Sequence, residues 1–438
     1  MRGIEAALKV LSAVEKGGFA SQKLRDLPLD APDRTLAASL VYACLRRAEL
    51  WRFLAFEYLR PKPEGFSPSV RLALQLGAAG ALELKNFAVP ALVNGLVDWT
   101  KRSDRGGAKV VNAVMRRLLD QGPARLEQLG NDRSLEARSL LFGVPLWAAR
   151  LFTRDYGSET GDALLKTQQS PVALALRVSR SDLRERVLAS LGASGWNASP
   201  SDLLSESIRL ETTALPPCLP GYDAGLVTPQ SETSMSVAHE AAASCPEGRI
   251  LDMCAGRAVK SGAVLQANVR LTLEGWDLSK PRVLAGMKEL TRLNLTGRAK
   301  LRTGDALELV PEEAPDAILV DAPCSGSGTW RRHPEAKWRL SESDLASNSA
   351  LQRRLLDRAC RLVKPGGTVI YSTCSLFAAE NEAVVSQVIE ETPMTVEPLS
   401  PSFKFDSLRS PGAVAFPSTP WNDGFYLVKL RRPLGKER

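Results

Sequence analysis

Histidine is scarce in this sequence, and the cysteines lack the spacing of a metal site. The 438 residues include two histidines, His239 and His333, and seven cysteines with no Cys-x-x-Cys pair. With so little histidine, most Ser-His and Cys-His hydrolase schemes have no general base. An odd set of cysteines without paired spacing also argues against a zinc site and a disulfide framework. We therefore expect no metal in this protein.

Long apolar runs are also missing. No stretch of about 18 or more apolar residues occurs, and no charged-then-apolar leader follows Met1, so we expect neither a membrane span nor a secretory signal. Apolar residues make up 44% and charged residues 24%, which is typical of globular proteins. A chain of this length should form roughly two or three domains. The expected location is the cytoplasm and the expected state is a monomer.

Positive charge is concentrated in the first third of the chain. Residues 1–140 hold 22 Lys and Arg against 15 Asp and Glu, whereas the other 298 residues hold 35 against 34. A basic segment joined to a nearly neutral remainder predicts a polyanion-binding module attached to a catalytic one. A basic surface that serves only solubility is the alternative, and charge alone does not decide between them.

Residues 1–140 have the pattern of an all-α domain. From Ile4 to about Gln121, apolar residues recur at three- and four-residue steps without β-branched alternation, which indicates five to seven packed helices. Two arginine pairs at helical positions, Arg46-Arg47 and Arg116-Arg117, are candidate phosphate-binding groups. A solvated face without a ligand is the alternative for either pair.

The middle of the chain, residues 141–235, reads as a small α+β connector. A polar connection over 122–145 ends at Pro145 and predicts the boundary. Beyond it, the patterns predict helices at 146–165 and 183–191 and strands at 172–178 and 208–211.

Residues 236–438 alternate strands and helices, which predicts an α/β doubly wound, Rossmann-like sheet. Strands are predicted at 250–254, 271–276, 300–303, 317–320, 368–371 and 424–430, and helices at about 260–267, 280–294, 342–363 and 379–391.

Two stretches, 318–328 and 369–375, end a predicted buried strand with a cysteine and small residues. Ligands of open α/β sheets bind at the C-terminal edge of the strands, so we expect Cys324 and Cys374 to meet there. A buried inert thiol is the commonest fate of a free cysteine. Neither residue is at a core position, however, because each follows a strand and precedes a turn.

Acidic residues follow three successive strands of the same predicted sheet. The strand at 250–254 runs into a small-residue turn, with Lys260 at the start of the next helix, and Asp277 and Asp305 end the second and third strands. Such carboxylates accept hydrogen bonds from ribose hydroxyls and an adenine edge. Each acid alone is equally well explained as a helix N-cap. The absence of GxGxxG at the first turn favours S-adenosylmethionine over NAD.

Thiols at this edge suggest addition to an electron-poor carbon. A thiolate that adds to C6 of a pyrimidine makes C5 nucleophilic enough to accept a methyl group, and a second group must then assist release. Asp321 is placed to face N3 and N4 of a cytosine. The residues alone do not rank Cys324 and Cys374. The other cysteines are expected to be structural, with Cys254 also lining the cofactor pocket: Cys44, Cys218, Cys245, Cys254 and Cys360.

Several motifs resemble the RNA 5-methylcytosine methyltransferases of the RsmB/Nop2/Sun family, over nearly the whole chain. The first 140 residues, with Val111–Arg117, are similar to a NusB-like domain. The catalytic motifs are Asp321–Gly328, Arg331–Glu335 with Lys337-Trp338, Tyr371–Ser375, Glu380–Glu382 and Asp423–Tyr426.

The resemblance implies roles for individual residues. Cys374 would be the nucleophile and Cys324 would assist product release, with Asp321 near the methyl donor and the target base. The cofactor S-adenosylmethionine would be bound by Asp277, Asp305 and Asp321 and by the turn Cys254, Ala255, Gly256, Arg257, Ala258, Val259 and Lys260.

The cofactor turn departs from the family pattern. The family usually has Cys-Ala-Ala-Pro-Gly-Gly-Lys, whereas this chain has Ala258 and Val259 in place of the two glycines. A β-branched residue tolerates positive φ poorly. We expect either a different path, with Gly256 supplying the freedom, or weaker cofactor binding, and we predict that binding survives.

Three functions remain open at this point. The first is methylation of cytosine C5 in 16S ribosomal RNA of the small-subunit precursor, with a flipped or unpaired base. The second is a non-catalytic RNA-binding or ribosome-assembly factor with an altered cofactor turn. The third, DNA cytosine methylation, would use a Pro-Cys nucleophile and would not need Cys374.

Overall fold

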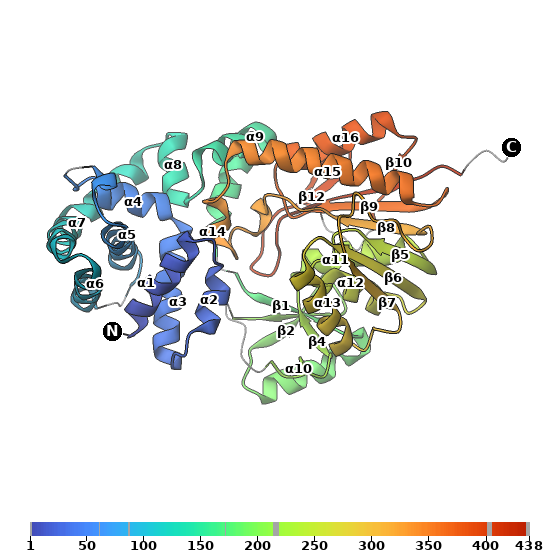
Figure 1. The fold of residues 1–438 in the computed structure, drawn as a ribbon, viewed down its shortest axis with the longest axis horizontal. Helices are drawn as coiled ribbons and strands as arrows, with labels where there is room; N and C mark the ends of the chain where they lie inside the picture. The colour runs from blue at the N-terminus through green and yellow to red at the C-terminus, as the bar shows by residue number, and fades with distance from the viewer. Residues whose placement is uncertain are drawn as a thin grey trace. The chain divides into compact units, whose positions relative to one another are not determined.

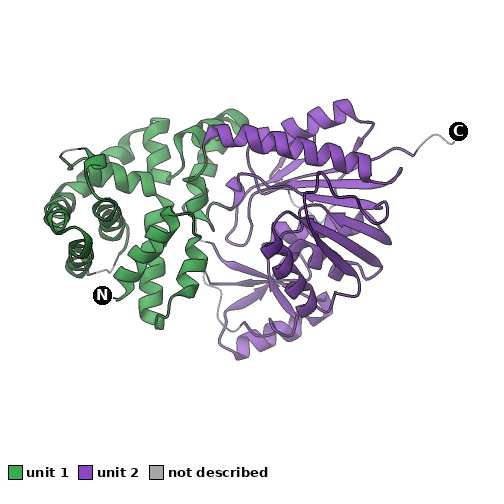
Figure 2. Ribbon diagram, in the orientation of Figure 1, with its two compact units in different colours: residues 1–170, 330–340 green, residues 171–329, 341–438 purple. Residues whose placement is uncertain are grey.

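A computed structural model describes residues 2–60, 62–85, 88–170, 172–212, 219–400 and 405–434. The chain forms two compact units, which Figure 2 distinguishes by colour. Unit 1 comprises Met1–Ser170 with Trp330–Leu340, and unit 2 comprises Pro171–Thr329 with Ser341–Arg438. The division into three domains stays a prediction.

Unit 1 is helical, as the apolar spacing predicted, and its core is built from fully buried aliphatic side chains such as Leu8, Leu40 and Leu74. The described residues up to 131 form seven α-helices, within the predicted number (Figure 1). These helices are α1 (Arg2–Glu15), α2 (Ala20–Asp26), α3 (Ala31–Arg46), α4 (Ala48–Phe56), α5 (Pro68–Leu82), α6 (Val89–Ser103) and α7 (Arg105–Asn131), followed by α8 (Leu135–Phe142), α9 (Leu146–Thr167) and, much later, α14 (Pro334–Lys337).

The prediction that residues 122–145 form a polar connection is wrong. Helix α7 continues through Pro123, and α8 follows after Ser134, whose side chain accepts a hydrogen bond from the amide of Ala137. An interior proline removes one backbone hydrogen bond. That loss is offset because Leu129 and Ala137 are buried in the core of unit 1.

The segment Trp330–Leu340 belongs to unit 1 although it lies far along the sequence. Trp338 Nε1 donates to the carbonyl oxygen of Leu45 at 2.6 Å, and Lys337 Nζ donates to that of Arg46 at 2.9 Å. Lys337 is fully buried, and burial lowers its pKa to about 7. The segment is therefore part of the packed structure of unit 1.

Unit 2 begins with a four-stranded antiparallel sheet in the order β2-β3-β1-β4. The predicted elements of this region are confirmed, whereas β2 and β4 were missed because three residues show no periodicity. Cys218 lies outside the described residues. The elements are β1 (Leu174–Val178), α10 (Arg184–Ala193), β2 (Ala198–Pro200), β3 (Ser207–Leu210) and β4 (Val227–Pro229).

The larger sheet of unit 2 has the order β11-β12-β13-β9-β8-β5-β6-β7, with β10 paired to β13. Strands β5 to β9 are parallel, and β13 joins β9 antiparallel. Figure 1 shows α15 and α16 on one face and α11, α12 and α13 on the other. The elements are α11 (Glu232–Ala243), β5 (Gly248–Asp252), α12 (Val259–Ala267), β6 (Leu271–Asp277), α13 (Lys280–Arg292), β7 (Ala299–Thr303), β8 (Ala317–Asp321), α15 (Glu342–Leu362), β9 (Thr368–Thr373), α16 (Glu382–Glu391), β10 (Thr395–Glu397), β11 (Ser407–Leu408), β12 (Ala413–Ala415) and β13 (Phe425–Arg431).

The doubly wound, Rossmann-like prediction is therefore confirmed. Each predicted strand and helix of this sheet is present, with ends shifted by up to three residues. Helix α11 was missed because serine, threonine and alanine fill it and almost all of it is buried, which removes the apolar periodicity. The order reverses between β5 and β8, which places the expected ligand site at their C-terminal ends.

Candidate active site

Strands β8 and β9 carry the two cysteines to one edge of the sheet. The strands pair in parallel with Asp321 opposite Ser372, and Cys324 and Cys374 follow in the next turns. Their sulfur atoms lie 3.4 Å apart, and both side chains are partly exposed. The structure thus brings together two thiols that a substrate can reach.

Cys324 is protonated at neutral pH. The hydrogen bond with Cys374 and burial raise the pKa of Cys324 well above its ordinary value. Either sulfur can donate in the contact between them, so the order of the two cysteines rests on the family resemblance.

Asp321 forms an ion pair at the end of β8. Lys260 Nζ lies 2.7 Å from Asp321 Oδ2, Ser372 Oγ donates to Asp321 Oδ1 at 3.0 Å, and the Lys260 ammonium lies 5.0 Å from the centre of the Phe425 ring. Burial lowers the pKa of Lys260, but Asp321 outweighs burial and the net direction is upward. Lys260 is therefore charged at neutral pH beside the thiols.

Sequence reasoning missed a further acid, Asp252, at the end of β5. Its side chain is 1% exposed, Ser261 Oγ donates to Oδ2 at 2.7 Å, and the amide of Cys254 donates to Oδ1 at 3.3 Å. Burial raises the pKa of Asp252 to about 6. The sequence does contain a signal for Asp252, since this acid ends a strand whose preceding residues, Ile250 and Leu251, are apolar.

Asp252 gives a pH prediction. Between pH 4 and 6 the folded protein holds a proton that the unfolded chain has released, so stability falls as pH rises through this window. Asp252→Asn removes this titration and keeps partners for Ser261 and Cys254. Relative to wild type, the free energy of unfolding of Asp252→Asn should be about 3 kcal/mol larger at pH 8 than at pH 4. Denaturant unfolding at the two pH values measures this difference. Asp120→Asn at an exposed position is the control, and a difference from wild type that stayed constant with pH would contradict the assignment.

The cofactor turn contains two residues with positive φ, and Gly256 supplies part of this freedom, as one of the two expectations had it. Gly256 has φ +56° and Ala258 has φ +58°, whereas Val259 is the first residue of α12. The β-branched residue therefore lies where ordinary helical φ is needed, so its side chain causes no backbone strain. Only Ala258 bears the strain, about 1–2 kcal/mol, and its buried methyl group returns about 0.8 kcal/mol.

Position 258 should not accept a larger residue. Ala258→Val is expected to destabilise the protein by roughly 2–3 kcal/mol, because a β-branched side chain is strongly disfavoured at positive φ and the site is fully buried. Val259→Ala, next to it, should cost less than about 1 kcal/mol. Urea unfolding of the two variants tests the difference, and equal losses would contradict the assigned backbone path.

Asp277 and Asp305 differ in their surroundings. Asp277 is nearly buried and accepts hydrogen bonds from the amides of Gly256 at 3.0 Å and Ser279 at 2.8 Å. Asp305 is exposed, and its Oδ1 accepts from the amide of Leu307 at 2.9 Å. Each carboxylate thus fixes a turn, but neither is a helix N-cap: the N-cap of α13 is Ser279, and no helix lies in the fully described stretch between β7 and β8. Each also keeps acceptor capacity, because a carboxylate offers about four lone-pair sites.

Buried polar side chains lie behind the two cysteine turns. Glu380 and Asn381, both fully buried, hydrogen-bond the residues that flank Cys324 and Cys374, and Gln352 of α15 takes part. The sequence marked Glu380 and Asn381 only as part of a motif. Gln352 gave no signal, because it lies in the middle of a polar helix.

The remaining described cysteines are thiols whose pKa is raised, so none of them is an activated nucleophile. Cys44, Cys245 and Cys360 are buried, and burial raises the pKa of Cys44 and of Cys360 to about 12. Cys254 is partly exposed beside the cofactor turn, and burial of its sulfur raises its pKa well above the ordinary value. All four remain protonated at neutral pH.

The two arginine pairs of unit 1 have different environments. Arg46 and Arg47 are partly buried, and Arg47 lies 3.5 Å from Glu83 in an ion pair. Arg116 and Arg117 are exposed on α7. Of the two candidate phosphate-binding pairs, only the second is freely accessible.

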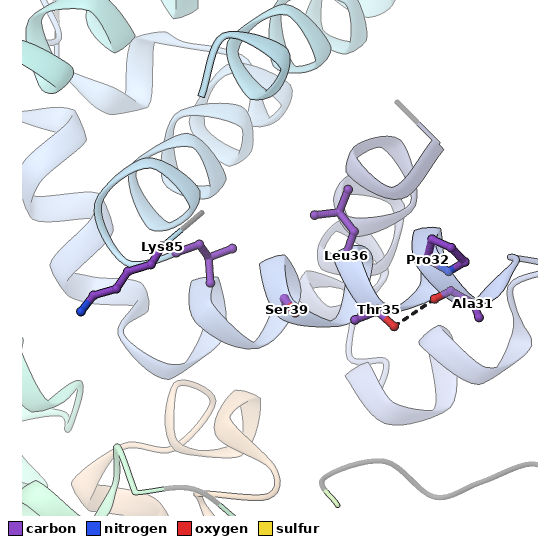
Figure 3. Close-up of a pocket in the computed structure, with 7 residues that line it drawn as sticks. Ala31, Pro32, Thr35, Leu36, Ser39 and Lys85 are labelled. Carbon is purple, nitrogen blue, oxygen red and sulfur yellow. Dashed lines mark hydrogen bonds between the residues drawn. The ribbon is translucent and has the colours of Figure 1, made fainter. Parts of the chain in front are cut away.

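A groove of about 570 Å³ lies on unit 1 (Figure 3). Thr35 Oγ1 already donates to the carbonyl oxygen of Ala31 at 2.9 Å, and Lys85 supplies the one titratable side chain of the lining. The groove therefore offers no catalytic set. Its lining is Ala31, Pro32, Thr35, Leu36, Ser39, Leu84 and Lys85.

Across the described ranges, no helix combines the length and apolar composition needed to cross a membrane. Within the same ranges, no group of three or more His, Cys, Asp or Glu side chains is arranged to hold a metal ion.

The fold has close counterparts among solved structures. The crystal structure of the protein PH0851 matches with a TM-score of 0.84 at 22% identity, covering 98% of each chain. NSun6 from Pyrococcus horikoshii with SFG matches with a TM-score of 0.58 at 19% identity, covering 66% of this chain and 98% of that one. Unit 2 accordingly carries a Rossmann-like methyltransferase fold, and it is joined to a helical domain.

Sequence comparisons define the family. The family model for 16S rRNA methyltransferase RsmB/F matches residues 241–431, and the NusB family model matches residues 3–120. Ribosomal RNA small subunit methyltransferase B of Thermus thermophilus is 33% identical over 432 residues, which cover 97% of this chain and 96% of that protein. The chain belongs to the RsmB/F family of rRNA methyltransferases and has an N-terminal NusB domain.

Proposed function

We propose that this methyltransferase uses S-adenosylmethionine to methylate cytosine C5 in 16S ribosomal RNA through a covalent adduct between Cys374 and C6. The observation that carries the proposal is the pair of thiols 3.4 Å apart at the ends of neighbouring parallel strands. The charged Asp321–Lys260 pair beside them supports it. A non-catalytic factor has no chemical need of this arrangement.

Cys374 begins the reaction by forming a bond from its sulfur to C6. As this bond forms, the S–H bond of Cys374 breaks and its proton ends on N3 of the cytosine, beside Asp321. Asp321 accepts hydrogen bonds from the N3–H and N4–H edge of the resulting ring, and Lys260 Nζ holds Asp321 Oδ2 at 2.7 Å. Addition at C6 places electron density on C5.

Cys324 completes the reaction. Once Cys374 is bonded to carbon, the thiol–thiol hydrogen bond that raises the pKa of Cys324 is lost. Cys324 releases its proton to water and, as a thiolate, takes the proton from C5. The electron pair of the C5–H bond forms the C5–C6 double bond and expels the Cys374 sulfur, which takes up a proton as N3 loses its own.

The residues present fit the proposed cofactor. The turn around Gly256 is open, since a Cβ placed there would meet nothing closer than 3.9 Å, and Asp277 and Asp305 offer acceptors at successive strand ends. These two carboxylates would hold the ribose and adenine, with the turn 254–260 beside them. S-adenosylmethionine supplies an electrophilic methyl group when bound. Calorimetric titration that found no binding, even with RNA present, would contradict the proposal.

Methyl transfer assays separate the candidate functions. Tritiated S-adenosylmethionine is incubated with the protein and either 30S RNA lacking the modification or duplex DNA. Label in C5 of cytosine in the RNA alone supports the proposed function. Label in DNA would favour DNA methylation, and no label despite RNA binding would favour the non-catalytic factor.

The exposed pair Arg116-Arg117 should contribute to RNA binding. Replacing both with alanine is expected to weaken binding of 16S RNA about tenfold at low salt and to reduce the slope of log K against log salt by about 1–2, since two phosphate contacts are lost. Filter binding over a salt series measures both quantities. Arg186→Ala, at an exposed position of unit 2, is the control. Unchanged affinity in the double variant would place the RNA contacts elsewhere.

A further inference from the structure

We infer that Glu380 and Asn381 are positioning residues, each of which holds one of the two thiols in place for its own step of the reaction. Glu380 fixes the turn that carries Cys324, and Asn381 fixes the turn that carries Cys374. The inference rests on the proposed function, in which Cys374 attacks and Cys324 assists release. It adds a structural reason why two neighbouring thiols keep separate roles.

Glu380 fixes the residue after Cys324. The carboxylate is fully buried and accepts hydrogen bonds from Ser325, from the amide at 2.8 Å and from the hydroxyl at 2.5 Å. It also accepts from Gln352 Nε2 at 3.2 Å, and the same nitrogen donates to the carbonyl oxygen of Pro323 at 2.9 Å. Cys324 is thus held from both sides.

Asn381 holds Cys374 in the same manner. Its side-chain oxygen accepts from the hydroxyl of Thr373 at 2.5 Å, and its side-chain nitrogen donates to the carbonyl oxygen of Ser375 at 3.0 Å. Thr373 and Ser375 are the residues directly before and after Cys374, and both are fully buried. A shift of Asn381 would therefore move the backbone on both sides of the attacking sulfur.

Two consecutive residues can serve different turns because the chain changes direction between them. Glu380 ends a short 3-10 helix (Ala378–Glu380), and Asn381 lies between it and α16. The two sets of contacts do touch, because Ser325 Oγ lies 3.2 Å from Ser375 Oγ. Apart from this contact, Glu380 bonds Ser325 whereas Asn381 bonds Thr373 and Ser375, so we expect each residue to affect mainly one step.

The test measures attack and release separately. In a Cys324→Ser background, the rate at which RNA becomes covalently bound reports attack alone. Asn381→Ala should slow this rate about tenfold or more, because small displacements of a nucleophile are costly, whereas Glu380→Ala should change it by less than about threefold. In the background with both cysteines, Glu380→Ala should raise the fraction of protein held as adduct about tenfold, and Asn381→Ala should not raise it.

Milder variants keep the test decisive if an alanine variant fails to fold. Thr373→Val removes the hydroxyl that Asn381 accepts from, and should also slow attack. Glu380→Gln keeps an acceptor for the Ser325 amide and should restore release at least in part. Glu391→Gln is the matched control, because this exposed carboxylate at the end of α16 pairs with Arg353 and should affect neither step.

The outcomes distinguish two failures. If Cys324→Ser alone formed no adduct, the proposed function would be wrong and this inference with it. If Cys324→Ser formed the adduct but the Glu380 and Asn381 variants slowed attack equally, only the division of roles would be overturned. Equal losses of melting temperature with no selective effect on either step would have the same consequence.

Discussion

Replacing Cys374 with serine is expected to lower methyl transfer to RNA by a factor on the order of 10⁴ or more. The first step is addition of the Cys374 sulfur to C6, and a serine hydroxyl is far less acidic and less nucleophilic than a thiol. The contacts around the turn come from Thr373 and Ser375, so the fold does not depend on the sulfur. Single-turnover transfer of a tritiated methyl group measures the loss.

A matched cysteine separates the chemistry from the loss of any thiol. Cys245 is buried in unit 2 and its Sγ donates to the carbonyl oxygen of Glu247 at 2.9 Å, a bond that serine keeps. Cys245→Ser should therefore retain activity. Cofactor affinity, measured by titration, should be unchanged in Cys374→Ser. If this variant kept more than about a tenth of the activity, attack would have to be assigned to another group.

The sheet of unit 2 could be predicted because its central strands are apolar runs separated by helices of clear period. The run Ala317–Asp321 is buried on both faces, and its sequence alone marks it as a parallel strand. Strands β10, β11 and β12 gave no such signal. They are two or three residues long and are ordered by pairing around the antiparallel strand β13, which is a tertiary effect.

The sequence predicts which residues belong to the site better than it predicts which of them contact one another. Strand ends point to Cys324 and Cys374, but these residues are 50 positions apart and nothing local gives their distance. The pairing of Lys260 with Asp321 spans 61 positions. At Ala258 the steric rule that favours glycine holds, because the residue has positive φ. The sequence could not show that the methyl group of Ala258 is buried and offsets part of the strain.

Replacing Cys324 with serine is expected to stop the reaction after attack. Cys374 can still add to C6, because its turn is held by Asn381 and not by Cys324. The C5 proton then has no thiolate to accept it, since a serine hydroxyl stays protonated at neutral pH. Protein and RNA should remain joined, and turnover should fall by about 10²–10³ or more, in the range of a lost general base.

The adduct is detected as a shift of radiolabelled RNA to the mass of protein plus RNA on a denaturing gel. The double variant Cys324→Ser with Cys374→Ser should form none, because the attacking sulfur is gone. An adduct in Cys374→Ser and none in Cys324→Ser would reverse the two roles. Normal turnover by Cys324→Ser would remove the need for a second thiol, and the 3.4 Å contact between the sulfurs would then need another explanation.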